Sequence, residues 1–176
     1  TEIGLHSKHS EYKDGVKTKI GETAVCNLSS INLSKHIKNG KIDRTKLADT
    51  ISKVIRALDN VIDINFYPTK EANNSNKRHR PIGMGTMGWA DVYAQIRIPQ
   101  DSEKAVEFAD ELMEFISYHA IFNSSKLAKE RGKYESYEGS KWSQGILPID
   151  SYKQLIKWKK SKFLGSEGIM DWSKLR

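Results

Sequence analysis

IGETAVCNLSSINL occupies residues 20–33. Apolar and polar residues nearly alternate through Ala24, Cys26 and Leu28, and Ile31 and Leu33 follow. This spacing predicts a buried strand that leaves into a loop. A lone cysteine in a buried strand is most often a small core hydrophobe, so the pattern by itself gives Cys26 no chemical role.

The chain on either side of this stretch carries strand, turn and helix signals in turn. Upstream, Asp14-Gly15 within a polar segment is typical of a hairpin turn. Downstream, Asn39-Gly40 predicts a turn and Asp43 predicts the N-cap of a helix. Apolar residues then recur three and four positions apart, which predicts one buried helix face that ends before the proline at 68. That face consists of Leu47, Ile51, Val54, Ile55, Leu58 and Ile62.

The rest of the chain continues the alternation. The predicted elements are a polar loop over 69–80, a short strand over 81–85, a helix over 89–96, a long helix over about 101–131 between an N-cap at Ser102 and a C-cap at Gly132, an irregular stretch over 133–150, a helix over about 150–162, and an amphipathic turn from Asp171-Trp172. Strands that alternate with helices indicate the α/β class. A length of 176 residues suits one domain, taken as 1–176.

Composition excludes several classes of protein. No run of about 18 apolar residues is present, which excludes a transmembrane helix, and no signal-peptide pattern is visible. A single cysteine excludes an internal disulfide framework and a cysteine-cage zinc site, so a reducing cytoplasm is the expected compartment. The net charge of +7 fits an anionic partner, although a solvated lysine-rich surface explains most of it.

Two local motifs allow both a functional and a structural interpretation. Gly83-Met84-Gly85-Thr86-Met87-Gly88 matches the G-x-G-x-x-G pattern of dinucleotide-binding enzymes, but no hydrophobic strand precedes it. A tight strand-to-helix turn is the preferred interpretation, and a dehydrogenase is the weakest alternative. The basic cluster 77–80 fits phosphate or nucleic acid, or more simply a solvated face. The five histidines show no metal-binding spacing.

Taken together and in order, several segments resemble one enzyme family. These are TAVCNLSSINL at 23–33, RALDNVID at 56–63, NFYP at 65–68, RPIGMGTMGWAD at 80–91 and SQGILPIDSY at 143–152. At these distances the chain resembles the catalytic barrel of the ribonucleotide reductase large subunit, most closely its aerobic class I form. The resemblance implies a partial ten-stranded α/β barrel, namely a second-half segment with outer helices, incomplete at both ends.

The resemblance also implies roles for two residues. Glu2 matches the glutamate that acts as general base at the ribose 3′-hydroxyl, and Cys26 matches one thiol of the redox-active pair that reduces the substrate. The radical-bearing cysteine of the family would lie just before Thr1, and the second thiol of the pair lies far upstream. We therefore expect Cys26 on a buried strand at the mouth of the barrel, and we expect the isolated chain to be inactive.

Partners follow from the same resemblance. No cofactor or metal is expected in this chain, because a metal-containing small subunit supplies the radical and thioredoxin or glutaredoxin supplies the electrons. The substrate would be a ribonucleoside diphosphate, and the remaining large-subunit segments would complete an allosterically controlled enzyme of deoxyribonucleotide biosynthesis and DNA replication. The start at Thr1 suits an extein after an intein junction, a split-gene product or a truncated record.

One rival function belongs to a different class of protein. A non-catalytic nucleic-acid-binding protein would use the basic surface, and its binding would weaken steeply with added salt. That interpretation also expects Cys26 to be buried and unreactive.

Overall fold

The structure is a computed structural model that describes residues 7–150 and 168–175. The strands are β1 (Glu11–Lys13), β2 (Val16–Lys19), β3 (Asn27–Asn32), β4 (Ile37–Lys38), β5 (Lys41–Ile42) and β6 (Ile82–Met87). The α-helices are α1 (Arg44–Ile64), α2 (Lys70–His79), α3 (Trp89–Ile96) and α4 (Glu103–Arg131), with 3-10 turns η1 (Leu33–His36) and η2 (Trp172–Leu175). The mixture of strands and helices agrees with the α/β class expected from the sequence.

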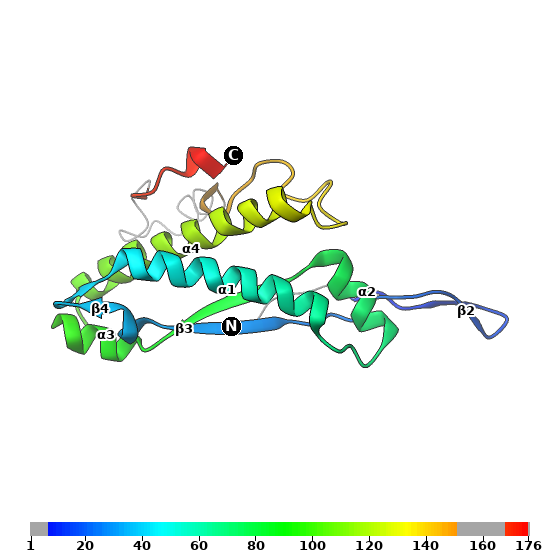
Figure 1. The fold of residues 1–176 in the computed structure, drawn as a ribbon, viewed down its shortest axis with the longest axis horizontal. Coiled ribbons are helices and arrows are strands. Elements are labelled where there is room, and N and C mark those ends of the chain that lie inside the picture. The colour runs from blue at the N-terminus through cyan, green and yellow to red at the C-terminus, as the bar shows by residue number, and fades with distance from the viewer. Residues whose placement is uncertain (1–6, 151–167, 176) are drawn as a thin grey trace.

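A parallel pair of strands, β3 and β6, forms the centre of the fold (Figure 1). The register runs from Asn27 opposite Ile82 to Asn32 opposite Met87. The strand predicted within 20–33 is confirmed, but it begins only at Asn27. The strand predicted over 81–85 is also confirmed and extends to Met87.

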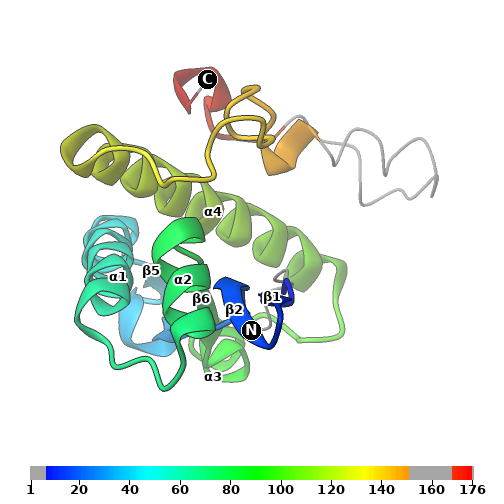
Figure 2. The ribbon, with the colours of Figure 1, turned by 90° about the vertical axis from the view of Figure 1, so that its right-hand side faces the viewer.

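Helices α1 and α4 pack together on one side of this strand pair (Figures 1 and 2). Asp43 caps α1 by accepting a hydrogen bond from the Lys46 amide, as the sequence predicts. The predicted α1 stripe is buried, except that Val54 is half-buried. The main core consists of Ile31, Leu33, Leu47, Ile51, Ile55, Val92, Leu112, Phe115, Ile116 and Leu127.

The opposite face of the strand pair lacks such a layer among the described residues. Leu28 is 52% exposed and Met87 is 51% exposed. Because side chains alternate between the two faces of a strand, Leu28 and Ser30 lie on one face, and Ile31 faces the helices. Each strand of the pair therefore presents one covered face and one open face.

The hairpin turn and the ends of the later helices lie where the sequence predicts them. The β1–β2 hairpin turns at Asp14-Gly15, and both residues have positive φ, as a type I′ turn requires. The hairpin extends beyond α2 (Figure 1). Helix α3 covers the predicted residues, and α4 begins after its predicted N-cap Ser102 and ends at Gly132.

The polar loop predicted over 69–80 is wrong, because helix α2 forms there from Lys70 to His79. Thr69 caps α2 by accepting from the Ala72 amide, and Arg80 ends it in the left-handed conformation. The side chains that α2 buries include Ser75 and Asn76, which are 2% and 0% exposed. A search for apolar periodicity misses this helix because its inner face is largely polar.

The C-terminal part folds back onto α4. The irregular stretch predicted over 133–150 is confirmed up to residue 147, and residues 148–150 are already helical. Leu147 joins Tyr118 and Trp172 in a second small core. The carboxylate of Glu114 accepts hydrogen bonds from the Ile169 and Met170 amides and from the Trp172 indole N–H. The helix predicted over about 150–162 lies almost wholly outside the described residues, whereas the turn predicted from Asp171-Trp172 is confirmed.

Candidate functional site

Cys26 lies directly before β3 and is exposed. The prediction of a buried strand position is therefore wrong, and so is the simple interpretation of Cys26 as a core hydrophobe. The reason is the phase of the strand: Asn27, which is 6% exposed, faces inward, while Leu28 lies on the open face. Cys26 stands two positions before Leu28, at the end of the strand where the chain enters. Glu2 lies outside the described residues, so its approach to Cys26 stays a prediction.

The segment that leads to Cys26 is held by backbone hydrogen bonds. Glu22 exchanges two bonds of 2.8 Å with Lys8, and the Thr23 amide donates to the Glu71 carbonyl at 3.2 Å. The Ala24 amide donates to Ser7 Oγ at 3.2 Å. These contacts fix residues 22–24 against the N-terminal arm and the start of α2.

A buried carboxylate provides the strongest side-chain contact in this segment. Glu22 is 3% exposed, yet it is charged and lies between two basic residues of α2. Its Oε1 accepts from Arg78 Nη1 at 2.6 Å, and its Oε2 lies 2.9 Å from His79 Nε2. The hydrogen bond with His79, followed by that with Arg78, holds the pKa of Glu22 below its usual range, although burial opposes this.

Sequence reasoning missed Glu22, although one signal was present. Glu22 is the only acidic residue between Asp14 and Asp43, in a stretch rich in lysine and small polar residues. This lone acid lies four positions before Cys26. The sequence offers many basic residues, however, and only the fold shows that the partners lie more than fifty positions away.

The basic cluster 77–80 is neutralised within the protein. Lys77 pairs with Asp63, Arg78 with Glu22 and Glu135, His79 with Glu22, and Arg80 with Asp59 and Asp63. Hydrogen bonds from Arg80 and Lys77 hold the pKa of Asp63 far below its usual range. Basic side chains that already bind carboxylates offer little to an anionic ligand. This geometry favours the structural interpretation of the cluster over a phosphate or nucleic-acid site.

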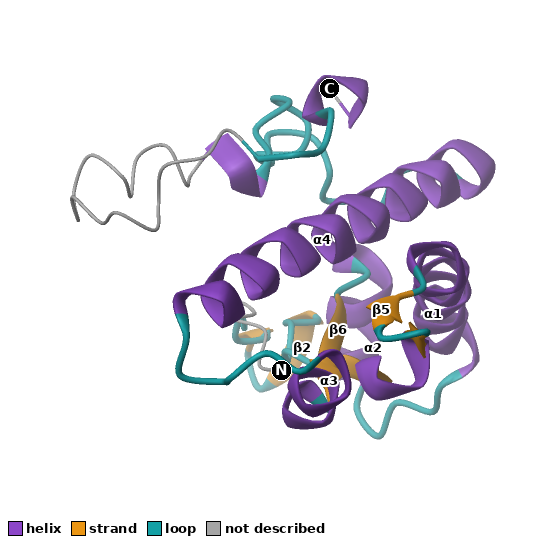
Figure 3. Cartoon of the chain, turned by 90° about the vertical axis from the view of Figure 1, so that its left-hand side faces the viewer, coloured by secondary structure: helices purple, strands orange, loops and turns teal. Residues whose placement is uncertain are grey.

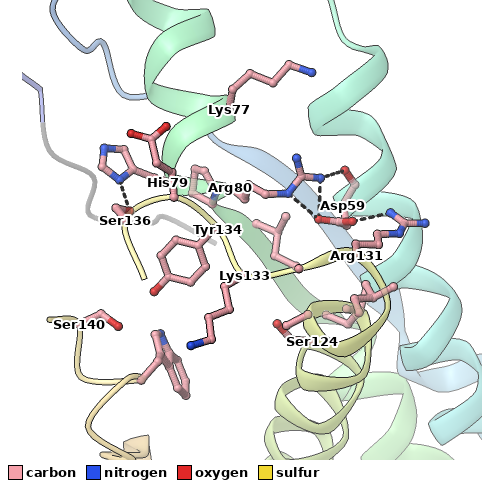
Figure 4. Close-up of a pocket in the computed structure, with 18 of the residues that line it drawn as sticks. Asp59, Lys77, His79, Arg80, Ser124, Arg131, Lys133, Tyr134, Ser136 and Ser140 are labelled. Carbon is pink, nitrogen blue, oxygen red and sulfur yellow. Dashed lines mark hydrogen bonds and ion pairs between the residues drawn. The ribbon is translucent and has the colours of Figure 1, made fainter. Parts of the chain in front are cut away.

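A cavity of about 980 Å³ opens beside this cluster (Figure 4). It lies between the ends of α1, α2 and α4 and the segment that follows α4, and Cys26 does not line it. Asp59 at its edge accepts hydrogen bonds from both Arg80 and Arg131 (Figure 4). The cavity wall thus joins three helices through ion pairs, away from the candidate thiol.

The glycine motif has a structural role. Gly83 and Gly85 lie inside β6, so they do not form the loop between strand and helix that a dinucleotide-binding motif requires. Gly88 is the N-cap of α3 with a φ of 82°, and a Cβ there would lie 2.8 Å from Asn32 Oδ1. The preferred interpretation, a tight strand-to-helix turn, is confirmed (Figure 3).

Within the described ranges, no group of three or more His, Cys, Asp and Glu side chains is arranged to hold a metal ion. None of the helices in those ranges is long and apolar enough to cross a membrane. The chemical candidates that remain are a thiol at the entrance of a parallel strand and the charged cluster that holds the segment before it.

A parallel strand pair that carries its helices on one face is the building unit of α/β sheets and barrels. Comparison with known proteins identifies the family: the chain belongs to the family of the ribonucleotide reductase barrel domain, whose model matches residues 1–176. The family expected from the ordered sequence segments is thereby confirmed.

Individual relatives carry related names. The chain is 52% identical over 157 residues to ribonucleoside-diphosphate reductase subunit alpha of Chlamydia pneumoniae. The matched residues make up 88% of this chain and 15% of that protein. The chain is 49% identical over 132 residues to the subunit alpha of Helicobacter pylori, with coverage of 75% and 16%. It is 40% identical over 155 residues to the large chain of Schizosaccharomyces pombe, with coverage of 88% and 18%. The chain therefore spans less than a fifth of the length of these relatives.

Proposed function

We propose that this chain is a segment of the catalytic barrel of a ribonucleoside-diphosphate reductase large subunit, in which Cys26 supplies one of the two thiols that reduce the ribose. The observation that carries the proposal is the position of Cys26, exposed at the entrance of β3 in a chain matched throughout by the barrel family. A thiol must be exposed to exchange electrons with a substrate and then with an external reductant.

The open face of the β3–β6 pair fits the interior of a barrel. Parallel strands are almost always covered on both faces, yet Leu28 and Met87 are half exposed here. Further strands of a ten-stranded α/β barrel would close around this face, with α1 and α4 as outer helices. Cys26 would then stand at the rim of the barrel interior, close to a bound substrate.

The proposed chemistry needs two thiols and a base. The substrate loses its 2′-hydroxyl as water and gains a hydrogen, while two thiols give up two electrons and two protons and become a disulfide. Cys26 would be one of these thiols, and its partner would have to approach within about 6 Å between α-carbons. Glu2 would act as the general base at the 3′-hydroxyl, next to the radical cysteine of the family.

The partners of the proposed enzyme follow from this role. A small subunit would generate the radical, and thioredoxin or glutaredoxin would reduce the disulfide after each turnover. The nucleotide site and the control of substrate choice would involve the remaining segments of the large subunit.

A single-turnover assay tests the proposal. The full-length large subunit is reduced, freed of external reductant, and mixed with the small subunit and a ribonucleoside diphosphate. Cys26→Ser should reduce deoxynucleotide formation to background, because a hydroxyl cannot form the disulfide. Val25→Ser is the control, because it introduces serine at the neighbouring position and keeps the Cys26 thiol. It should leave product formation intact. Normal product from the Cys26→Ser variant would refute the proposal.

A further inference from the structure

The segment that carries Cys26 is fixed at two points separated by very few residues. On one side, the side chain of Glu22 is buried against α2 and the Thr23 amide is bonded to the Glu71 carbonyl. On the other side, Asn27 is buried and begins the β3–β6 ladder opposite Ile82. Only residues 24–26 lie between these two points. The two anchors therefore restrict where this short segment can place the thiol.

The upstream anchor is unusual because it rests on a buried charge. A carboxylate is rarely buried unless it is paired, and Glu22 is paired with two basic side chains of the last turn of α2. The neighbouring backbone leaves no room for adjustment, since a Cβ at Gly21 would collide with the Lys8 carbonyl oxygen. Asn74 on α2 also donates a 2.9 Å hydrogen bond to the Gly21 carbonyl.

Helix α2 is itself fixed to the body of the fold. Arg80 at its C-terminus donates to Asp59 at 2.8 Å and to Asp63 at 2.9 Å, and both carboxylates belong to α1. Arg131 of α4 binds the same Asp59. Polar contacts therefore fix the end of α2 to the helix layer, and the same end of α2 holds Glu22, four residues before Cys26.

His79 extends these contacts to the segment after α4. Its Nδ1 lies 2.7 Å from Ser136 Oγ, so Ser136, His79 and Glu22 form a line that resembles a hydrolase triad. Arg78 also binds the Glu22 carboxylate, and the Ser136 amide donates to the Arg78 carbonyl at 3.4 Å. These additional bonds attach the segment after α4 to α2, so the three side chains have a structural role.

We propose that Glu22 is a positioning residue for the Cys26 thiol: through Arg78 and His79 it fixes the segment before β3, so that the thiol is held in place at the entrance of the strand pair. This inference rests on the proposed function of Cys26. Disulfide formation tolerates only a narrow range of sulfur positions, and small displacements of a reacting group cost large factors in rate. Loss of the Glu22 anchor would weaken the attachment of this segment on its upstream side without removing any group that touches the substrate.

The test compares variants of the full-length large subunit, assayed with the small subunit and reductant. Glu22→Gln keeps the shape of the side chain but removes its charge, and we expect kcat to fall about tenfold to hundredfold. KM for the ribonucleoside diphosphate should stay within about twofold, because nothing that binds the nucleotide has changed. Glu11→Gln is the matched control, since Glu11 forms an exposed ion pair with Lys19 in the hairpin, and it should leave both constants unchanged.

Three results would overturn the inference. The first is a wild-type kcat in Glu22→Gln while Cys26→Ser is inactive, which would leave the proposed function standing. The second is a fall in kcat that only matches the loss of folded protein, measured by circular dichroism and gel filtration. The third is an active Cys26→Ser, which would refute the proposed function itself. If Glu22→Gln fails to fold, Arg78→Gln decides, because Arg78 is 37% exposed and its replacement should lower kcat in the same direction.

Discussion

Helices α1 and α4 share a buried apolar core, with ion pairs such as Arg56–Glu130 at its exposed edge, whereas the side chains that α2 buries are mostly polar. Along α1 the buried side chains are Leu47, Ile51, Ile55, Leu58 and Ile62. Along α2 they are Ala72, Ser75 and Asn76. The outer contacts of α2 and its C-cap are the ion pairs of Lys77, Arg78 and Arg80 and the hydrogen bond of His79 with Glu22. Asn76 donates a 2.6 Å bond to the Tyr67 hydroxyl, which donates in turn to the Ile62 carbonyl at 2.8 Å.

This difference shows that the contacts that stabilise the fold are not the ones that position the segment before Cys26. Burial of apolar surface is strong but not directional, so it holds α1 in the core without fixing any one atom. Hydrogen bonds and paired charges contribute less net free energy but demand geometry. Helix α2 uses the second kind of contact, and it is the helix that holds the segment leading to Cys26.

The largest effect should come from a cavity in the apolar layer. Ile51 is fully buried on α1, so Ile51→Ala should lower the free energy of local opening by about 2–5 kcal/mol. Hydrogen–deuterium exchange of the full-length subunit measures this opening peptide by peptide. Protection should fall in α1, α4 and α2 together, because α2 is attached to α1. Unchanged protection in α4 would show that the two helices do not share one core.

A smaller and more local effect should come from the polar junction. Asp59 has a side chain only 15% exposed and binds Arg80 and Arg131, so Asp59→Ala should cost about 1–3 kcal/mol. The same exchange measurement should show loss in α2 while the middle of α1 stays protected. Asp49→Ala is the matched control on α1, because Asp49 is 59% exposed in a pair with Lys53, and it should change little. Equal loss in both variants would contradict the distinction between the two helices.

The apolar part of the fold could be predicted from the sequence because its signals are local. The stripe of α1, its cap at Asp43 and the hairpin turn at Asp14-Gly15 are patterns within a few residues. Helix α2 could not be predicted this way, because its buried face is made of residues that usually indicate a loop. Its cap at Thr69 was a signal, but without an apolar stripe the pattern looked like a polar connection.

The site was predictable only in part, for a related reason. Family resemblance pointed to Cys26, but the alternation of Ala24, Cys26 and Leu28 suggested the wrong face. The strand begins one residue later, and its inward positions include Asn27, a polar residue that a hydrophobicity pattern places outside. Glu22 could not be assigned because its partners lie 56 and 57 positions away and belong to a helix that the pattern missed.

The smallest predicted effect is a difference in how the exchange protection of α1 and of α2 responds to acid. This difference should be absent near neutral pH. Ion pairing holds the pKa of Glu22 below its usual range, and Lys17, whose ammonium binds Glu71, lowers the pKa of Glu71 to about 2. A carboxyl group whose pKa is lowered by folding stabilises the fold above its unfolded pKa, and this stabilisation is lost as pH falls through the folded value. Between about pH 7 and pH 5 the protection of α2 should therefore stay constant, and it should decline below about pH 4.5.

The apolar stripe of α1 contains no titratable group, so the middle of α1 should keep its protection after α2 has begun to lose it. Exchange measured at stepped pH, corrected for the intrinsic rate, gives both curves from one set of samples. Glu22→Gln serves as the internal reference, because glutamine does not titrate and the decline in α2 should become shallower. A decline of α1 before α2, or a decline of α2 above about pH 5, would show that the charged contacts are not what holds α2 in place.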